Sequence, residues 1–289
     1  MSTDARIHNV SDTAFWVANY RTNETDRPDA LFRDPLARKL AGIHGRNIAG
    51  SMPGSRMMEW SVVLRTVVID EFITRSIASG TDLILNLGAG LDARPYRMAL
   101  PSALRWVEVD FAPIIEYKQG KLANEIARCN LEHVSLDLTN REKRRKFLSS
   151  VNGSAKKILV LTEGVVPYLS LEEAGSLATD LRSNVRFGGW IVDYFSSQLI
   201  KMGNGRGMQQ RLQNAPFRFD PPNWPKFFRN HGWRVAEMRY LWDESVRCRR
   251  AIPLPAIARA FYAIRSRFGS KSVLAEFMQF IGYALMEQE

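Results

Sequence analysis

Two glycines directly follow a short apolar run and could bring a ligand against the backbone. The run is "LILNL" at residues 83–87, and Gly88 and Gly90 come next, on either side of Ala89. Glycine has no side chain, so a ligand can lie close to the main chain at such a turn. Because ordinary loops also use glycine freely, a lone G-x-G pair is weak evidence. The pair predicts a nucleotide-like ligand only if other residues support it.

Two carboxylates supply that support, because each lies at the end of a later apolar run. Asp110 ends "WVEVD", about 20 residues after the glycines, which is the position that hydrogen-bonds the ribose hydroxyls of a nucleoside. Asp137, in "VSLDL", lies where a carboxylate can accept from an adenine amino group. The alternative for each acid is that it caps the following helix.

The loop after the glycines bears on which nucleoside binds. "GAGLDARP" places Ala93 at the last position of the dinucleotide pattern, so the pattern alone still permits NAD. The chain continues into Arg94-Pro95-Tyr96, which we expect to be a poor helix start for holding a pyrophosphate. The sequence also has no Walker-type G-K-[ST]. A nucleoside without a phosphate fits better, which favours S-adenosylmethionine (SAM).

The elements that must position these residues alternate after residue 80. Helix-like segments separate short runs rich in β-branched residues, which occur at 83–87, 105–109, 133–136, 158–162 and 190–195. This alternation predicts right-handed crossovers and a mostly parallel sheet. Ser170 and Glu173 form a predicted capping box, and we expect the glycines of "VRFGGW" (185–190) to end the helix that begins there.

The two ends of the chain depart from this alternation. Three helical patterns precede residue 80, of which the last, 55–79, is long and heavily apolar, with Gly80 as its stop. Strand patterns at 233–241 and 280–288 close the chain, and the last strand could pair antiparallel. We therefore predict a doubly wound α/β fold with a mixed, seven-stranded sheet. Residues 1–80 would form a helical cap on the SAM-binding domain, 81–289, with lid insertions at 200–225 and 244–279.

Composition indicates an ordinary globular protein. The 289 residues are 45% hydrophobic and 24% charged, which allows a sizeable core. Cys129 and Cys248 lie far apart and in no metal-type spacing, so we expect no metal site and a reducing, cytoplasmic compartment. The first 20 residues lack the pattern of a signal peptide, and no apolar run approaches the ~20 residues of a membrane span.

The net charge of +10 has several interpretations. It could mean nucleic acid, an acidic surface or an anionic small substrate. The basic clusters at 141–147, 156–157 and 247–250 are typical of solvated helix faces. Aromatic residues are not interleaved with them as stacking platforms would be, so the charge does not indicate nucleic acid.

Four motifs together resemble the leucine carboxyl methyltransferase family. They are "NLGAGLDARPYRM", "WVEVDFAPIIEYKQGKL", "LTEGVVPYLSLEE" and "DTAFWVANYRTNETDRPDALFRDPLARKLAG". The resemblance is closest to the bacterial branch, which includes carboxyl O-methyltransferases of polyketide biosynthesis. It covers roughly residues 10–200 and, thinly, "FFRNHGW" and "IGYALME" near the end. It implies a Rossmann-like class I methyltransferase fold that uses SAM.

The resemblance also implies roles for individual residues. Arg65 would pair with the methionine carboxylate of SAM, and Glu163 would face the methionyl portion. The glycine loop would contribute Gly88 and Gly90, Asp110 would bind ribose, and Asp137 with the backbone of Leu138 would contact adenine. Arg65 lies among apolar residues and so needs an anionic partner, for which Asp70 or Glu71 is the alternative.

Further candidate residues concern the methyl acceptor. Tyr168 matches a tyrosine near the transfer site, although a core aromatic with a satisfied hydroxyl is the alternative. Cationic and aromatic side chains that could hold the acceptor are Tyr20, Arg21, Arg94, Tyr96 and Tyr194. The chain departs from many methyltransferases in having the neutral Asn86 before the loop. It also lacks the contacts of family members that act on a protein C-terminus, so we do not transfer a protein substrate.

Methyl transfer from a sulfonium is an in-line displacement in which the enzyme mainly positions the partners. An acceptor carboxylate is already ionised and needs no base, which agrees with the lack of a convincing catalytic histidine. A phenol would need a base such as Tyr168.

We therefore predict a SAM-dependent O-methyltransferase (EC 2.1.1.-) acting on a carboxylate, or a phenol, of a small anionic metabolite such as a polyketide. Helices near 252–275 could form a homodimer. The alternatives are a nucleic-acid methyltransferase, although no N-P-P-Y-type tetrapeptide occurs, and a SAM-binding protein without catalysis. A nicotinamide-dependent oxidoreductase would require a pyrophosphate site.

Overall fold

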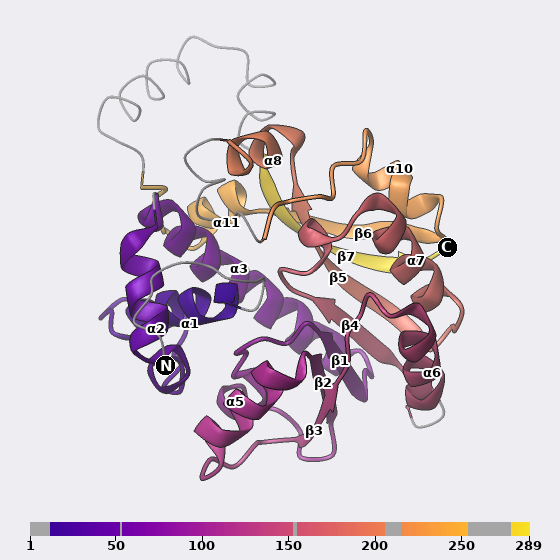
Figure 1. Ribbon diagram of the computed structural model, residues 1–289, viewed down its shortest axis with the longest axis horizontal. Coiled ribbons are helices and arrows are strands. Elements are labelled where there is room, and N and C mark those ends of the chain that lie inside the picture. The colour runs from indigo at the N-terminus through magenta and orange to yellow at the C-terminus, as the bar shows by residue number, and fades with distance from the viewer. Residues whose placement is uncertain (1–11, 53, 153–154, 206–214, 254–278) are drawn as a thin grey trace.

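The computed structural model describes residues 12–52, 54–152, 155–205, 215–253 and 279–289. Seven strands form one sheet in the order β3-β2-β1-β4-β5-β7-β6 (Figure 1). The strands are β1 (Leu83–Leu87), β2 (Arg105–Asp110), β3 (Asn130–Ser135), β4 (Ile158–Thr162), β5 (Phe187–Phe195), β6 (Trp233–Tyr240) and β7 (Ile281–Gln288). The first five are parallel, and β7 runs antiparallel to both β5 and β6. The predicted mixed, seven-stranded α/β sheet is confirmed.

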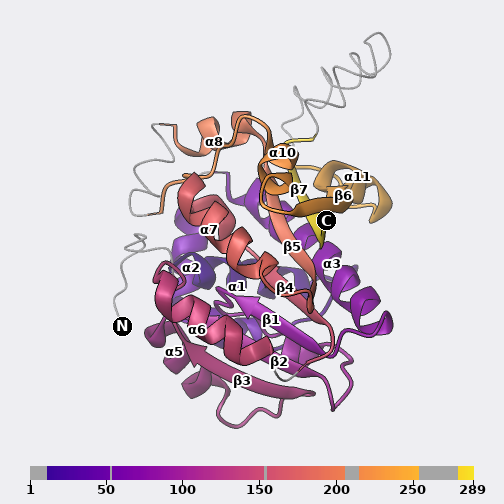
Figure 2. The ribbon, with the colours of Figure 1, turned by 90° about the vertical axis from the view of Figure 1, so that its right-hand side faces the viewer.

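Helices cover both faces of the sheet (Figure 2). One face packs against α3 (Ser55–Ala78) and α5 (Ala112–Leu122), and the other against α6 (Arg141–Asn152), α7 (Leu171–Arg182) and α10 (Trp224–Arg229). Short helices α4 (Arg94–Arg97), α8 (Ser197–Gly203) and α11 (Leu241–Arg247) lie in the connections. The expected lid insertions fall partly on residues 206–214 and 254–278, outside the described residues.

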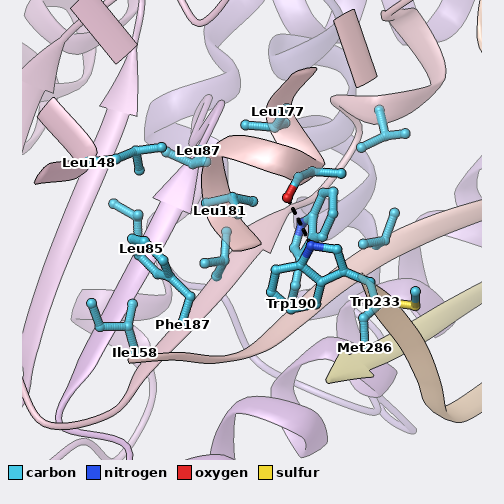
Figure 3. Packing of buried hydrophobic residues seen from close by; sticks show 14 of the residues in the cluster. Leu85, Leu87, Leu148, Ile158, Leu177, Leu181, Phe187, Trp190, Trp233 and Met286 are labelled. Carbon is cyan, nitrogen blue, oxygen red and sulfur yellow. Dashed lines mark hydrogen bonds between the residues drawn. The ribbon is translucent and has the colours of Figure 1, made fainter. Parts of the chain in front are cut away.

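The central strands are apolar because both faces of the sheet are covered. Every residue of β1 and β4 is buried, as in other parallel sheets between helix layers. Figure 3 shows the core on the α6–α7 face, where Leu85 and Leu87 lie near Leu148. The indole of Trp233 donates to the carbonyl oxygen of Ala178 at 2.9 Å, so this large ring is buried without an unpaired N–H.

The capping box predicted at the start of α7 is present. The Ser170 hydroxyl accepts from the Glu173 N–H at 3.1 Å, and the Glu173 carboxylate accepts from the Ser170 N–H at 2.7 Å. Gly80, with φ of +92°, directly follows the end of α3, as predicted.

One expectation about a helix end is wrong. Gly188 and Gly189 do not end α7, which stops at Arg182, but lie inside β5. A Cβ at Gly189 would lie 3.1 Å from Leu159 Cδ1, so these glycines permit close strand approach where the β4–β5 register shifts. The stretch containing Pro95 does form a helical turn, α4, because a proline in the first turn has no N–H to lose.

The helices that precede the sheet contact the loop after β1. They are α1 (Asp12–Thr25) and α2 (Ala37–Ser51), which pack against each other. A Cβ at Gly90 would lie 3.1 Å from the Cβ of Ala14 on α1, and Arg21 of α1 donates to the Leu91 carbonyl oxygen at 2.5 Å. The loop is therefore held from both sides, by the sheet and by α1.

Candidate functional site

The carboxyl ends of the parallel strands converge at one edge of the sheet, and the glycine loop begins there. Gly88 and Gly90 have φ values of +72° and +51°, which disfavour any residue with a side chain. A Cβ at Gly88 would also lie only 2.3 Å from Cγ2 of Val165, which follows β4. Both glycines are therefore needed for the turn, and they leave its backbone uncovered by side chains of their own.

Asp110 lies directly against this loop, as its position at the end of β2 predicted. One of its carboxylate oxygens accepts from the Gly90 N–H at 2.7 Å, and the other accepts from the Phe111 N–H at 2.7 Å. Burial raises the pKa of Asp110, and these two N–H bonds only partly offset that effect. A partly buried carboxylate that favours further donors is suited to bind hydroxyl groups.

Arg65 and Glu163 form an ion pair at the end of β4. The Arg65 Nε lies 2.7 Å from Glu163 Oε1, and both side chains are largely buried. Burial opposes ionisation of Glu163, but Arg65 and Arg94 together hold its pKa below the ordinary value. The partner of Arg65 is thus neither Asp70 nor Glu71, the alternatives that its own helix offered.

Arg94 lies inside the molecule and binds three carboxylates. Its guanidinium donates to Asp70 at 2.6 Å, to Asp92 at 2.9 Å and to Glu163 at 2.7 Å, and the residue is 2% exposed. These partners belong to α3, the glycine loop and the end of β4. The contacts are those of a residue that fixes three elements relative to one another.

Arg21 and Tyr20, the other candidates on α1, are also buried. Arg21 donates to Asp34 at 2.9 Å as well as to Leu91. Tyr20 packs beside Trp16, with ring centroids 6.2 Å apart, and burial raises the pKa of its hydroxyl. Tyr168 packs against the same apolar cluster, which therefore joins α1 to the end of β4.

The other three candidate tyrosines lie in three different clusters. Tyr168, in the short helix η1 (Val166–Tyr168), has its ring 5.4 Å from that of Phe217, and burial raises its pKa to about 12. Tyr194 packs on the rings of Trp224 and Tyr240. Tyr96 packs against a cluster between α1, α2 and α5. The structure therefore does not bring Tyr96 and Tyr194 to Tyr168.

Asp137 and Leu138 follow β3, one strand beyond Asp110. The Asp137 carboxylate accepts from the N–H and the hydroxyl of Thr139, at 2.8 and 2.7 Å. The Leu138 carbonyl oxygen accepts from Arg144 at 2.6 Å. Both residues lie at the same edge of the sheet as Asp110, as expected of adenine contacts.

Sequence reasoning missed two acids at this edge, Asp92 and Asp193, and considered a third, Asp70, only as a partner of Arg65. Asp92 accepts from the Asn86 amide at 3.0 Å, so an acid does lie beside Asn86, supplied by the loop. Asp70 binds Arg94 and Arg97. Asp193 is a lone acid in the apolar strand "WIVDYF", which was an available signal, and burial raises its pKa to about 7.

These residues fit SAM. A guanidinium and a carboxylate side by side complement the carboxylate and ammonium of an amino acid, as Arg65 and Glu163 do. Asp110 offers acceptors for two ribose hydroxyls, and the glycine loop exposes backbone beside it.

Every helix in the described part of the chain is too short or too polar to span a bilayer. In the same residues, no group of three or more His, Cys, Asp or Glu could hold a metal ion.

Comparisons with known proteins point to the same cofactor. The family model described as leucine carboxyl methyltransferase matches residues 14–181, more than half of the chain. A protein of Frankia alni assigned as a SAM-dependent methyltransferase is 34% identical over 176 residues, covering 57% of this chain and 61% of the relative. The chain thus aligns with less than two thirds of that relative's length. A second such protein, of Streptomyces coelicolor, is 28% identical over 242 residues, covering 78% of this chain and 83% of the relative.

A solved structure extends the comparison over nearly the whole chain. A DUF574 family protein from Streptomyces avermitilis has a TM-score of 0.55, with 94% of this chain and 96% of that chain covered. Its sequence is 13% identical, so the likeness concerns the fold alone.

Proposed function

Because the chain belongs to the leucine carboxyl methyltransferase family, we propose that it is a SAM-dependent methyltransferase that esterifies a carboxylate of a small anionic metabolite such as a polyketide. SAM supplies a methyl group that is already activated. An acceptor carboxylate is ionised at neutral pH and can attack without losing a proton. The protein then needs only to align the two reactants.

The observation that carries this proposal is that the titratable groups at the end of β4 are already engaged. Glu163 is paired with both Arg65 and Arg94, and the Tyr168 hydroxyl has a pKa of about 12. Asp193 is 2% exposed and accepts from the Gly164 N–H through both oxygens. None of the three is placed to deprotonate an acceptor, so an acceptor that arrives ionised fits best.

Each site residue has a proposed role. Arg65 binds the methionine carboxylate, Glu163 the ammonium, and Asp110 the ribose, while Gly88 and Gly90 let the backbone approach the nucleoside. Asp137 and the Leu138 backbone contact adenine. Arg21 and Arg94, which sequence reasoning assigned to the acceptor, instead position the loop, because their donors already bind Asp34, Leu91 and the three carboxylates.

The acceptor side is then formed by aromatic residues. Tyr168 lies beside Phe217, which in turn lies 5.3 Å from Phe195 at the end of β5. We propose Tyr168 as a packing surface for the acceptor and not as a base.

Cys129 and Cys248 are both unpaired, which supports a reducing, cytoplasmic setting. The proposed dimer helices near 252–275 lie outside the described residues.

The experiment that tests the proposal compares acceptor classes. The purified protein is incubated with methyl-labelled SAM and a panel of aromatic and aliphatic carboxylic acids, each paired with its phenol analogue. We expect labelled products from carboxylic acids, and mild alkali should release the label as methanol because methyl esters hydrolyse. Labelled products that resist alkali and arise only from phenols would contradict carboxylate methylation and indicate ether formation.

A further inference from the structure

Asp193 is a buried acid with no role in the function proposed so far. It lies on β5 in register with Tyr283 of β7, so the two side chains share one face of the sheet. Its two carboxylate oxygens accept from the Gly164 N–H at 3.0 and 3.2 Å. Gly164 has φ of +68° and directly follows Glu163, so this contact fixes the turn that presents Glu163.

Charged groups surround Asp193 from each neighbouring element. Arg65 of α3 and Glu163 after β4 act electrostatically on the Asp193 carboxyl group. Asp193 in turn raises the pKa of two hydroxyl groups, those of Tyr168 on η1 and Tyr283 on β7. A Cβ at Gly164 would lie 3.7 Å from an Arg65 guanidinium nitrogen, so the turn that Asp193 holds also borders Arg65. Tyr283 hydrogen-bonds to the same Arg65 side chain. Arg65 therefore pairs with the Glu163 carboxylate and also acts electrostatically on the Asp193 carboxyl group.

We propose that Asp193 is a positioning residue of the SAM site, which holds the Glu163–Gly164 turn and, when ionised, competes with the carboxylate of SAM for the charge of Arg65. The proposal rests on the assignment of Arg65 and Glu163 to the methionyl portion of SAM. Asp193 would act without touching SAM, and its ionisation would make the affinity for SAM depend on pH.

The direction of that dependence follows from the charges. Burial raises the pKa of Asp193 to about 7, with Glu163 acting in the same direction and Arg65 opposing it. Below this pH the neutral carboxyl still accepts from Gly164, and Arg65 faces only Glu163. Above it a second anion faces Arg65, so a bound carboxylate is less favoured. SAM affinity should therefore fall as pH rises through 7.

A calorimetric titration of the full chain with SAM at pH 6 and pH 8 tests this inference. The variants are Asp193→Asn, which keeps an acceptor for Gly164 but cannot ionise, and Asp193→Ala, which removes both properties. Asp243→Asn, an exposed acid on α11, is the matched control. Titration of SAM's own ammonium is common to all proteins, so the difference between wild type and Asp193→Asn isolates Asp193.

We expect the Kd of wild type and of Asp243→Asn to rise from pH 6 to pH 8 by about fivefold more than that of Asp193→Asn. Asp193→Ala should bind at least about tenfold more weakly at both pH values. Equal pH dependence in wild type and Asp193→Asn would overturn the inference, and so would unchanged affinity in Asp193→Ala. If Asp193→Ala does not fold, the comparison with Asp193→Asn still decides. Because no acceptor is present, the result is independent of whether carboxylates are the substrates.

Discussion

At position 88, after the end of β1, two structural requirements can be met together only by glycine. Position 88 has a positive φ, and it lies in contact with Val165 from the neighbouring strand end. The same position is the one at which we propose that SAM approaches the backbone. Backbone conformation, packing and ligand access therefore all depend on a single missing side chain.

Gly88→Ala should destabilise the protein and abolish SAM binding. The left-handed conformation costs an alanine about 1–2 kcal/mol, and the 2.3 Å approach to Val165 Cγ2 forces a further shift of the loop. Urea unfolding and calorimetry measure the two effects. Gly120→Ala is the matched control, because nothing lies within 4 Å of its Cβ and it lies in α5, where alanine is favoured. Equal stability and affinity in both variants would contradict this account of the loop.

Individual site residues could be predicted where a sequence motif contains them. They could not be predicted where their role depends on a partner that is distant in the sequence. Gly88, Gly90 and Asp110 follow from position relative to strands, and the structure brings them together. The partners of Arg94 lie 24, 2 and 69 positions away in the sequence, so its ion pairs could not be inferred from spacing. Arg94 is basic and follows the loop, which suggested a substrate contact until its burial was known.

The strands were predicted from the sequence more accurately than the partners of single residues. All seven strands overlap the predicted runs. The bounds coincide at β1 and β4, because a strand buried on both faces has a distinctive composition, whereas β3, predicted at 133–136, has no fully buried residue. The misplaced element boundary, at Gly188 and Gly189, depended on how closely β4 approaches β5. That is a tertiary property and has no local signature.

One side chain joins α3, the glycine loop and the end of β4, so its removal should affect all three. Arg94→Ala removes the cation that pairs with Asp92, while Asp70 keeps Arg97 and Glu163 keeps Arg65. Losing one partner of a buried ionic group costs about 3–5 kcal/mol. Urea unfolding measures the loss. In contrast, Arg38→Ala removes an ion pair in which both side chains are more than half exposed, and should cost less than about 1 kcal/mol. A similar small cost for both would show that the three elements are held by other contacts.

For the whole molecule, one buried acid should make stability depend on pH. Asp193 has its pKa raised from 3.8 to about 7, so the folded protein binds this proton more tightly than the unfolded chain does. The stabilisation is fully present below about pH 4 and is lost progressively as pH rises to 7. Other acids here, such as Glu163, have lowered pKa values and act in the opposite sense, losing stabilisation as pH falls.

Asp193→Asn removes only the pH-dependent stabilisation that comes from Asp193. Its melting temperature relative to wild type should therefore increase from pH 5 to pH 8, by an amount equivalent to about 3 kcal/mol at most. Asp243→Asn, at an exposed site, should show no such trend. A constant difference across this range would mean that Asp193 is ionised throughout.

The central claim is that this edge of the sheet binds SAM, with Asp110 as its ribose ligand. Its most direct test is calorimetric titration of wild type and Asp110→Ala with SAM and, separately, with NADH. We predict one SAM site in wild type, and at least about tenfold weaker binding in the variant, since a hydrogen bond to a charged group contributes about 1.5–3 kcal/mol. Equal SAM affinity in the two proteins, or binding of NADH in place of SAM, would contradict the account.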